Sequence, residues 1–314
     1  MKQLLEMANK IKSMEVRGAG LIARTAAAQL RDYSERQNTR ELLEFNNNMK
    51  IAAELLVSTR PTAVSLPNAV RAVMRYTGDT IEEAKIDINK RANDFIENSR
   101  NAVRNIGEIG AKRVRDGDTI MTHCNSSAAL SIIETANKQG KNIRAIATES
   151  RPRWQGHLTI KQLDDEGIET SLIVDSAVRY FMKDVDIVVM GADAVTANGS
   201  IINKIGTSQI ALCAHEARKN VIIAAETYKF SPGSLLGDLI DIEERSSSEV
   251  ISDEKLKGYK HVSVKNPAFD VTPREYVDLI CTEVGAIPPE MAYIIIKEYL
   301  GYGLGDFNKM TKVL

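Results

Sequence analysis

Two residues of this chain, each directly after a short apolar run, are well suited to proton transfer. Cys124 lies in the segment HCNSSA, residues 123–128, ahead of a helix expected from SSAALSIIETANK. A thiol at a helix N-terminus faces unpaired N–H groups and the positive end of the dipole, which favour the thiolate and make it a usable base. The alternative is a buried structural cysteine. We prefer that alternative for Cys213 and Cys281, which lie within apolar helical patterns.

Asp193 follows the apolar run DIVVM, where a carboxyl group at a strand end can be partly desolvated and exchange a proton. Alone, it could simply cap a loop. The loop that follows carries Asn203, Lys204 and Gly206 before a helix expected to begin near Thr207. Amide, ammonium and backbone N–H donors together suit a hydroxylated, phosphorylated ligand.

Three arginine-containing segments are further candidates for phosphate binding. They are RGAG at residues 17–20 ahead of a helix, TRPT at 59–62 in a loop, and ESRPR at 149–153. Arginine side chains and glycine N–H groups bind phosphate oxygens through directional, charge-assisted hydrogen bonds. Any one of these arginines is an ordinary surface charge, so the prediction rests on the three clusters together. His123 should point to the opposite face of its strand from Cys124, which favours a structural role.

The candidate residues require a parallel sheet to bring them together. Short apolar runs at 119–123, 143–148, 171–174, 186–190 and 220–225 alternate with helical periods, which predicts a parallel sheet wrapped by helices. Loops and helix N-termini gather at the carboxyl ends of such strands. Cys124, residues 149–153, Asp193 and residues 226–229 would then share one edge of the sheet.

The first third of the chain has a different pattern. Up to about residue 110 its apolar residues recur at three and four positions, as in amphipathic helices. One helix is expected after Gly78, where Thr80 and Glu83 have capping-box spacing. We therefore predict an α/β protein with an N-terminal helical domain, residues 1–110, and a Rossmann-like domain with a mainly parallel sheet, residues 111–314. A ligand cleft between domains is the expected site.

Composition limits the class of protein. Lys plus Arg number 41 and Asp plus Glu 42, so the overall charge offers no long-range attraction to nucleic acid or to an anionic membrane. No stretch approaches the length of a membrane span, and three widely spaced cysteines indicate a reducing compartment. We expect a cytoplasmic protein with no nucleic-acid or membrane partner. Metal-ligand spacing is absent as well, so we expect no metal and no other cofactor.

Six motifs in order resemble one superfamily over nearly the whole chain: RGAG, TRPTAVSLPNA, THCNSS, ESRPRWQGHLT, GADAVTANGSIINKIGT and NPAFDVTPREY. It joins methylthioribose 1-phosphate isomerase, ribose 1,5-bisphosphate isomerase and the regulatory subunits of translation initiation factor 2B. Gly20, where methylthioribose enzymes usually carry proline, and the NPAFDVTP ending favour the ribose bisphosphate branch. That ending is also similar to the regulatory subunits, so a non-catalytic subunit and a methylthioribose enzyme remain as alternatives.

The resemblance implies a function and a set of residues. It implies isomerisation of ribose 1,5-bisphosphate to ribulose 1,5-bisphosphate in nucleotide (AMP) salvage, without a cofactor, by an oligomer built from dimers. Cys124 and Asp193 match the catalytic pair of the superfamily's enzymes, and the regulatory subunits generally lack that combination. The positions that would line the sugar bisphosphate site are Arg17, Gly18, Ala19, Gly20, Arg60, Ser126, Ser127, Ala128, Asn203, Lys204 and Lys229.

Overall fold

A computed structural model describes residues 1–13, 15–16, 18–60, 64–237 and 239–301. The chain divides into two compact units, Met1–Ala102 and Val103–Leu314. Their boundary falls inside the long helix α5 (Ile81–Ala111), whereas we expected it further along the same helix, at residue 110. A continuous helix carries no turn signal, so the sequence has no local feature to mark this division.

The first unit is helical. Its helices, with the first part of α5, are α1 (Lys2–Lys12), α2 (Ala19–Glu35), α3 (Leu42–Val57) and α4 (Ser65–Met74). Apolar side chains at helical spacing, including Leu4, Leu30, Phe45, Met49 and Ile88, form its core. This agrees with the periodicity that predicted amphipathic helices.

Helix α5 begins after the capping residues that the sequence indicated. The Glu83 N–H donates to Thr80 Oγ1 at 3.2 Å, and the Glu83 carboxylate accepts from the Asp79 N–H at 2.9 Å. In the usual capping box the returning carboxylate binds the N–H of the capping residue itself. Here it binds the residue before, which satisfies a donor just outside the helix.

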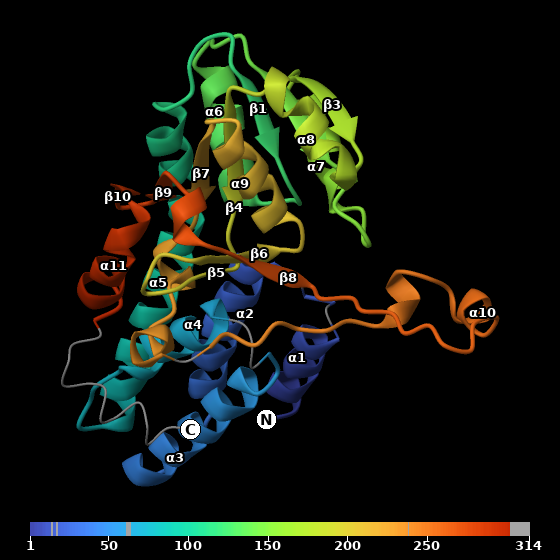
Figure 1. The fold of residues 1–314 in the computed structure, drawn as a ribbon. Helices are drawn as coiled ribbons and strands as arrows, with labels where there is room; N and C mark the ends of the chain where they lie inside the picture. The colour runs from blue at the N-terminus through green and yellow to red at the C-terminus, as the bar shows by residue number, and fades with distance from the viewer. Residues whose placement is uncertain (14, 17, 61–63, 238, 302–314) are drawn as a thin grey trace. The chain divides into compact units, whose positions relative to one another are not determined.

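The second unit contains a seven-stranded sheet in the order β10-β9-β7-β4-β1-β2-β3 (Figure 1). All neighbouring strands are parallel except β9 and β10. The strands are β1 (Thr119–Thr122), β2 (Arg144–Thr148), β3 (Glu169–Ile173), β4 (Ile187–Gly191), β7 (Asn220–Ala224), β9 (Leu279–Thr282) and β10 (Gly285–Ile287). The predicted α/β fold with a mainly parallel sheet is confirmed, and each of the five apolar runs contributes a strand.

Helices cover both faces of this sheet. They are α6 (Ser127–Lys138), α7 (Gln155–Asp165), α8 (Val178–Phe181), α9 (Thr207–Glu216) and α11 (Ala292–Glu298), and the short α10 (Asp253–Leu256) lies in an extended segment (Figure 1). Successive strand residues enter different cores: Ile120 packs with α6, whereas Met121 shares a core with α8, α9 and α11. This alternation explains why the strands are apolar on both faces.

A second, three-stranded antiparallel sheet was not predicted. It consists of β5 (Ala194–Val195), β6 (Ile201–Lys204) and β8 (Phe269–Thr272), in the order β5-β6-β8. We expected residues 198–206 to be a loop, and this was wrong because β6 lies within it. β6 pairs with β8, which is distant in sequence, so no local turn signal marks the pairing.

Candidate active site

Cys124 and Asp193 follow two neighbouring strands, β1 and β4, at the point where the order of the strands in the sheet reverses. β1 and β4 are paired in parallel, β2 and β3 continue the sheet beyond β1, and β7 and β9 continue it beyond β4. Chain segments leaving β1 and β4 therefore cross to opposite sides. Crevices at such switch points bind ligands in open α/β sheets. The structure thus puts the two predicted proton-transfer residues at the same carboxyl edge.

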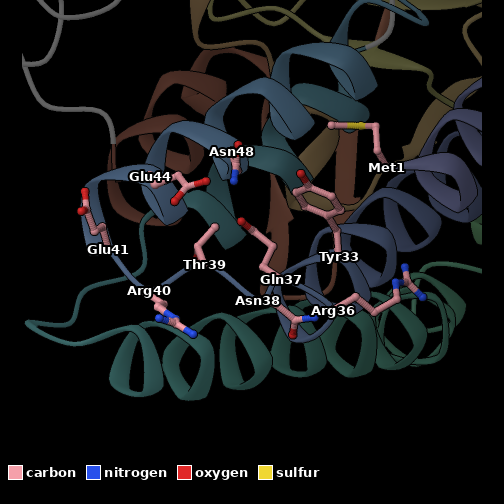
Figure 2. Close-up of a pocket in the computed structure, with 10 residues that line it drawn as sticks. All are labelled: Met1, Tyr33, Arg36, Gln37, Asn38, Thr39, Arg40, Glu41, Glu44 and Asn48. Atoms are coloured by element: carbon pink, nitrogen blue, oxygen red, sulfur yellow. The ribbon is translucent and has the colours of Figure 1, made fainter.

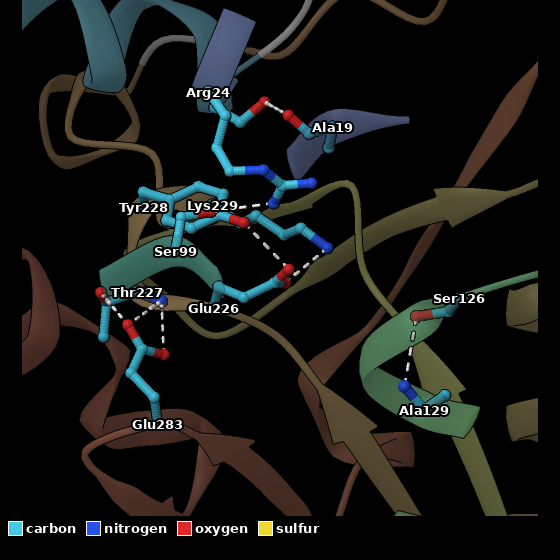
Figure 3. A network of polar contacts seen from close by, with 11 residues as sticks. Ala19, Arg24, Ser99, Ser126, Ala129, Glu226, Thr227, Tyr228, Lys229 and Glu283 are labelled. Atoms are coloured by element: carbon cyan, nitrogen blue, oxygen red, sulfur yellow. Dashed lines mark hydrogen bonds and ion pairs between the residues drawn. The ribbon is translucent and has the colours of Figure 1, made fainter. Parts of the chain in front are cut away.

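The segment between Cys124 and α6 offers backbone donors. Ser126 is the N-cap of α6, and its Oγ accepts from the Ala129 N–H at 3.3 Å (Figure 3). Ser127 and Ala128 are the first residues of the helix, where N–H groups have no acceptor within the helix. Those two groups are free to meet an anion from the direction of the helix axis. The predicted strand–Cys124–helix order is found.

Gly191 allows the ends of β1 and β4 to remain close together. A Cβ atom at Gly191 would overlap the Cβ and Oγ atoms of Ser126. The N-cap of α6 can therefore lie directly against the end of β4 only because this position has no side chain. This contact keeps the segment that carries Cys124 near the one that carries Asp193.

Burial changes the expected state of the thiol. Burial raises the pKa of Cys124 to about 11, the positive charge of Lys204 lowers it, and the negative charge of Asp193 raises it. The expectation that the helix N-terminus would favour a thiolate in the ligand-free protein was wrong, because the loss of solvation outweighs it. The same interactions demonstrate that Cys124, Asp193 and Lys204 share one electrostatic environment.

Lys204 and Asn203, at the end of β6, are both buried. The Lys204 ammonium group donates to the Ala268 carbonyl oxygen at 3.1 Å and lies 4.9 Å from the centre of the Phe269 ring. Burial lowers the pKa of Lys204, and the negative charge of Asp193 partly opposes this. Asn203 Nδ2 donates to Thr207 Oγ1 at 2.9 Å. Of the two predicted donors, Lys204 therefore lies close enough to Cys124 and Asp193 to affect their charges, whereas the amide of Asn203 binds the start of α9.

Lys229, by contrast, is already paired. Its ammonium group lies 2.7 Å from the Glu226 carboxylate in a buried ion pair, and the Tyr228 hydroxyl donates to Glu226 at 3.0 Å (Figure 3). Burial alone would raise the pKa of Glu226, but Lys229 lowers it below the ordinary value. Glu283, which we did not predict, accepts from the Thr227 N–H at 3.0 Å and fixes this turn.

The remaining predicted residues belong to the helical unit. Gly18 is the N-cap of α2 with a φ of 90°, and Ala19 and Gly20 open that helix. The Ser65 hydroxyl donates to the Ala19 carbonyl oxygen at 3.1 Å. Arg60 lies after the end of α3, and Arg17 lies outside the described residues. The predicted helix is found, but it begins at Ala19, within the RGAG motif rather than after it.

His123 has the structural role that the sequence favoured. It is buried, its Nδ1 lies 2.5 Å from Thr148 Oγ1, and its Nε2 lies 2.9 Å from the Ile205 carbonyl oxygen. Burial lowers its pKa, which favours the neutral ring. A neutral ring donates from one nitrogen and accepts at the other, which fits a carbonyl at Nε2 and a hydroxyl at Nδ1. His123 therefore joins the end of β1 to β2 and to the turn before α9.

Asp270, on β8, was missed by the sequence analysis. Its carboxylate accepts from the Gly206 N–H at 2.7 Å and from the Ser208 N–H at 3.1 Å, and so caps α9. Burial raises its pKa to about 6, although these hydrogen bonds oppose the rise. The NPAFDVTP segment contains this residue, but only the pairing of β8 with β6 brings it to α9.

The helical unit also contains an open cavity of about 500 Å³ (Figure 2). Its lining includes the exposed Arg36 and Arg40 and the buried Gln37, whose amide has no hydrogen-bond partner among the described residues. None of the predicted site residues lines it. The thiol, carboxylate and ammonium groups of Cys124, Asp193 and Lys204 instead interact at the edge of the sheet.

Within the described ranges, no group of three His, Cys, Asp or Glu residues could hold a metal ion. No helix among these residues is long and apolar enough to cross a membrane.

Comparisons with known proteins identify the family. The sequence profile of the initiation factor 2 subunit family matches residues 15–289. A relative from Archaeoglobus fulgidus, named ribose 1,5-bisphosphate isomerase, is 60% identical, covering 99% of this chain and 98% of its own. Methylthioribose-1-phosphate isomerase from Acetivibrio thermocellus is 38% identical, covering 92% of this chain and 89% of its own.

A solved structure of translation initiation factor eIF-2B from Pyrococcus horikoshii OT3 has the same fold. It matches with a TM-score of 0.78 at 32% identity, covering 92% of this chain and 98% of that one. Together, the relatives confirm the resemblance predicted from six motifs and the prediction that the chain is an isomerase. The chain belongs to the initiation factor 2 subunit family.

Proposed function

We propose that this protein converts ribose 1,5-bisphosphate to ribulose 1,5-bisphosphate, with Cys124 and Asp193 transferring the protons. The main support is the position of these two residues after neighbouring strands, in one electrostatic environment with Lys204. The identity of 60% with a named ribose 1,5-bisphosphate isomerase, against 38% with a methylthioribose enzyme, favours this substrate.

The substrate cannot open as an ordinary aldose because its anomeric oxygen carries a phosphate. We propose that Asp193 gives a proton to the ring oxygen as the bond from that oxygen to C1 breaks. The C1 cation that forms, stabilised by its remaining oxygen, makes the C2 proton acidic, and Cys124 removes it. Reprotonation of the enol at C1 and loss of the C2 hydroxyl proton give the ketose. No atom is gained or lost overall, so the reaction needs no oxidant or reductant.

The high pKa of Cys124 has a consequence for this step. A thiol with a pKa of about 11 is almost entirely protonated at neutral pH, and its thiolate is a strong base once formed. The charge of Lys204 lowers that pKa, and a bound cationic intermediate would lower it further. Deprotonation of Cys124 would therefore accompany ring opening, with its proton passing to Asp193 and from there to the ring oxygen.

The other predicted residues would bind the substrate. The N–H groups of Ser127 and Ala128 suit one phosphate at the start of α6, and Asn203 suits the sugar hydroxyls. Arg17, Gly18, Ala19, Gly20 and Arg60 would supply further phosphate contacts. Lys229 could bind a phosphate only by sharing its charge with Glu226.

The wider setting follows from the same proposal. The substrate and product are sugar bisphosphates that would be made and used in nucleotide salvage, in the cytoplasm. We also propose that the protein is a homo-oligomer built from dimers, since eIF2B subunits of this fold from C. thermophilum crystallise as a tetrameric complex.

Purified protein tested in parallel with ribose 1,5-bisphosphate and 5-methylthioribose 1-phosphate distinguishes the candidates. We expect ketose formation from the bisphosphate, and its loss in Cys124→Ser and Asp193→Asn. General acid–base groups typically contribute about 100-fold to 10,000-fold each. Cys213→Ser, which alters a thiol outside the site, is the matched control and should remain active. Turnover of the methylthio substrate alone, or binding to initiation factor 2 without turnover of either sugar, would reject the proposal.

A further inference from the structure

The backbone of Cys124 has a conformation that non-glycine residues rarely adopt. Its φ is 65°, in the left-handed region. Among the described residues, Ser150, Trp154 and Arg218 are the other non-glycine residues with positive φ. Two of these, Ser150 and Trp154, lie in the segment after β2, close in sequence to the groups that bind Cys124. Such conformations persist only where the surrounding structure enforces them.

Ser150 holds the N–H side of Cys124. The Cys124 N–H donates to Ser150 Oγ at 2.8 Å, and Ser150 is completely buried. The Asp175 carboxylate fixes Ser150 in turn, because it accepts from the N–H groups of Ser150 and Arg151, each at 2.8 Å. The Ser150 hydroxyl therefore ties the end of β2 to the segment after β1, and the Asp175 carboxylate ties it to the segment after β3.

Thr159 holds the carbonyl side. Its hydroxyl donates to the Cys124 carbonyl oxygen at 2.6 Å and accepts from Asn125 Nδ2 at 3.1 Å. Thr159 is buried in α7, and Gly156 allows this helix to approach, because a Cβ atom there would overlap the Thr148 carbonyl oxygen. Both peptide groups of Cys124 are thus bound by side chains of one short segment, residues 150–159.

We propose that Ser150 and Thr159 are positioning residues that hold Cys124 in the left-handed conformation, so that its thiol meets the sugar in a single orientation. With the backbone dihedral angles fixed, the direction of the Cα–Cβ bond is fixed. Loss of either hydroxyl would let Cys124 relax to an ordinary conformation and turn its thiol away. The effect on turnover rests on the proposed function, whereas the effect on the thiol does not.

Thr159→Val removes the hydroxyl and keeps the shape of the side chain. We expect kcat to fall by about 10-fold to 100-fold, the scale of a 1 Å misplacement, with KM close to that of the wild type. In the ligand-free protein, alkylation of Cys124 by iodoacetamide, read by mass spectrometry against Cys213, should become faster because the released thiol is more exposed. Thr159→Ser should restore both properties.

Thr170→Val is the matched control. The Thr170 hydroxyl also donates to a backbone carbonyl, that of Ile168 at 2.8 Å, but it does not touch Cys124. Its loss should leave kcat and Cys124 alkylation unchanged. Ser150→Ala tests the other anchor and should reproduce the effects of Thr159→Val, and it decides the question if Thr159→Val does not fold.

Wild-type kcat and alkylation in both Thr159→Val and Ser150→Ala would overturn the proposal. So would an equal loss in Thr159→Val and Thr159→Ser, because the serine keeps the hydroxyl. If the wild type does not isomerise ribose 1,5-bisphosphate, the proposed function fails, and the alkylation rates alone still decide whether these residues position Cys124.

Discussion

Lys204 is the residue through which the state of the Cys124 thiol can be tested directly. Its positive charge lowers a pKa that burial has raised to about 11. In Lys204→Met that pKa should rise further, so less thiolate is present and alkylation of Cys124 at pH 9 should slow. Mass spectrometry of the ligand-free protein measures this, with Lys161→Met, which alters an exposed side chain on α7, as the control. Equal rates in the wild type and Lys204→Met would contradict the coupling.

The same thiol predicts a pH profile for turnover. If Cys124 is the base and Asp193 the acid, turnover needs the thiolate and the Asp193 proton together, so the gain in thiolate with pH is offset and kcat/KM of the wild type should change little near neutral pH. In Asp193→Asn the acid is removed, so the residual kcat/KM should increase above pH 9, towards the raised pKa of the thiol of about 11. A plateau reached below pH 8 in this variant would indicate that another group is the base. The profile should be recorded with ribose 1,5-bisphosphate below its KM.

The sequence indicated which side chains are candidates for the site, but it did not indicate whether those side chains are ionised in the folded protein. The position of Cys124 before a helix is visible in the sequence, but the depth of its burial is set by strands and helices distant in the chain. Lys229 is a similar case. Glu226 stands three positions earlier, yet the sequence does not reveal that both side chains are buried together.

At the scale of secondary structure, Asp270 connects β8 to the start of α9. Its folded pKa of about 6 lies above its ordinary value of 3.8. The folded state therefore binds the proton more tightly, which stabilises the protein below about pH 4, and this contribution is lost as the pH rises through 6. Asp270→Asn lacks this titrating group, so its free energy of unfolding relative to that of the wild type should increase as the pH is raised from 4 to 7. Urea unfolding at several pH values measures the difference, and a constant difference would contradict the assignment.

Gly110, near the end of α5, has a packing role that opposes helix propensity. Replacing a helical glycine by alanine ordinarily adds about 0.5–1 kcal/mol of stability. A Cβ atom at Gly110 would overlap the side chain of Ile132 on α6, and overpacking typically costs about 1–3 kcal/mol. Gly110→Ala should therefore lower Tm. Adding Ile132→Val should recover part of the loss, whereas exposed Glu108→Ala should change little; a higher Tm in Gly110→Ala would contradict the prediction.

Five of the seven strands of the main sheet were predictable because each contains a short, continuous apolar run, whereas β9 and β10 were not among the predicted strands. β6 was not predicted either, since its last two residues are Asn203 and Lys204 and its partner β8 follows only after several further elements, among them α9, β7 and α10. The helical periodicity of apolar residues in the first hundred positions could also be recognised in the sequence. Pairing between distant strands depends on tertiary structure, which local patterns do not record.

For the whole molecule, binding of a sugar bisphosphate should appear as a gain in stability. A ligand that binds only the folded state adds about 2.7 kcal/mol at roughly 100 times its Kd. Ribulose 1,5-bisphosphate should therefore raise Tm, and by less in Lys204→Met. Because the net charge is only −1, this effect should depend on local groups rather than on the overall field. Inorganic phosphate at equal ionic strength is the control, and an equal rise with phosphate would argue against a sugar bisphosphate site.

The pairing of β1 with β4 also bears on how such a catalyst could diversify. Adjacent strands lie about 4.8 Å apart in every sheet. The spacing of the two strand ends that carry Cys124 and Asp193 is therefore set by backbone hydrogen bonding and not by the side chains around the site. Mutations in the surrounding loops could then exchange a phosphate-binding corner for a thioether-binding one without changing the separation of Cys124 and Asp193. One scaffold could in this way come to accept a different group at the far end of the sugar while the end held by these two residues stayed the same.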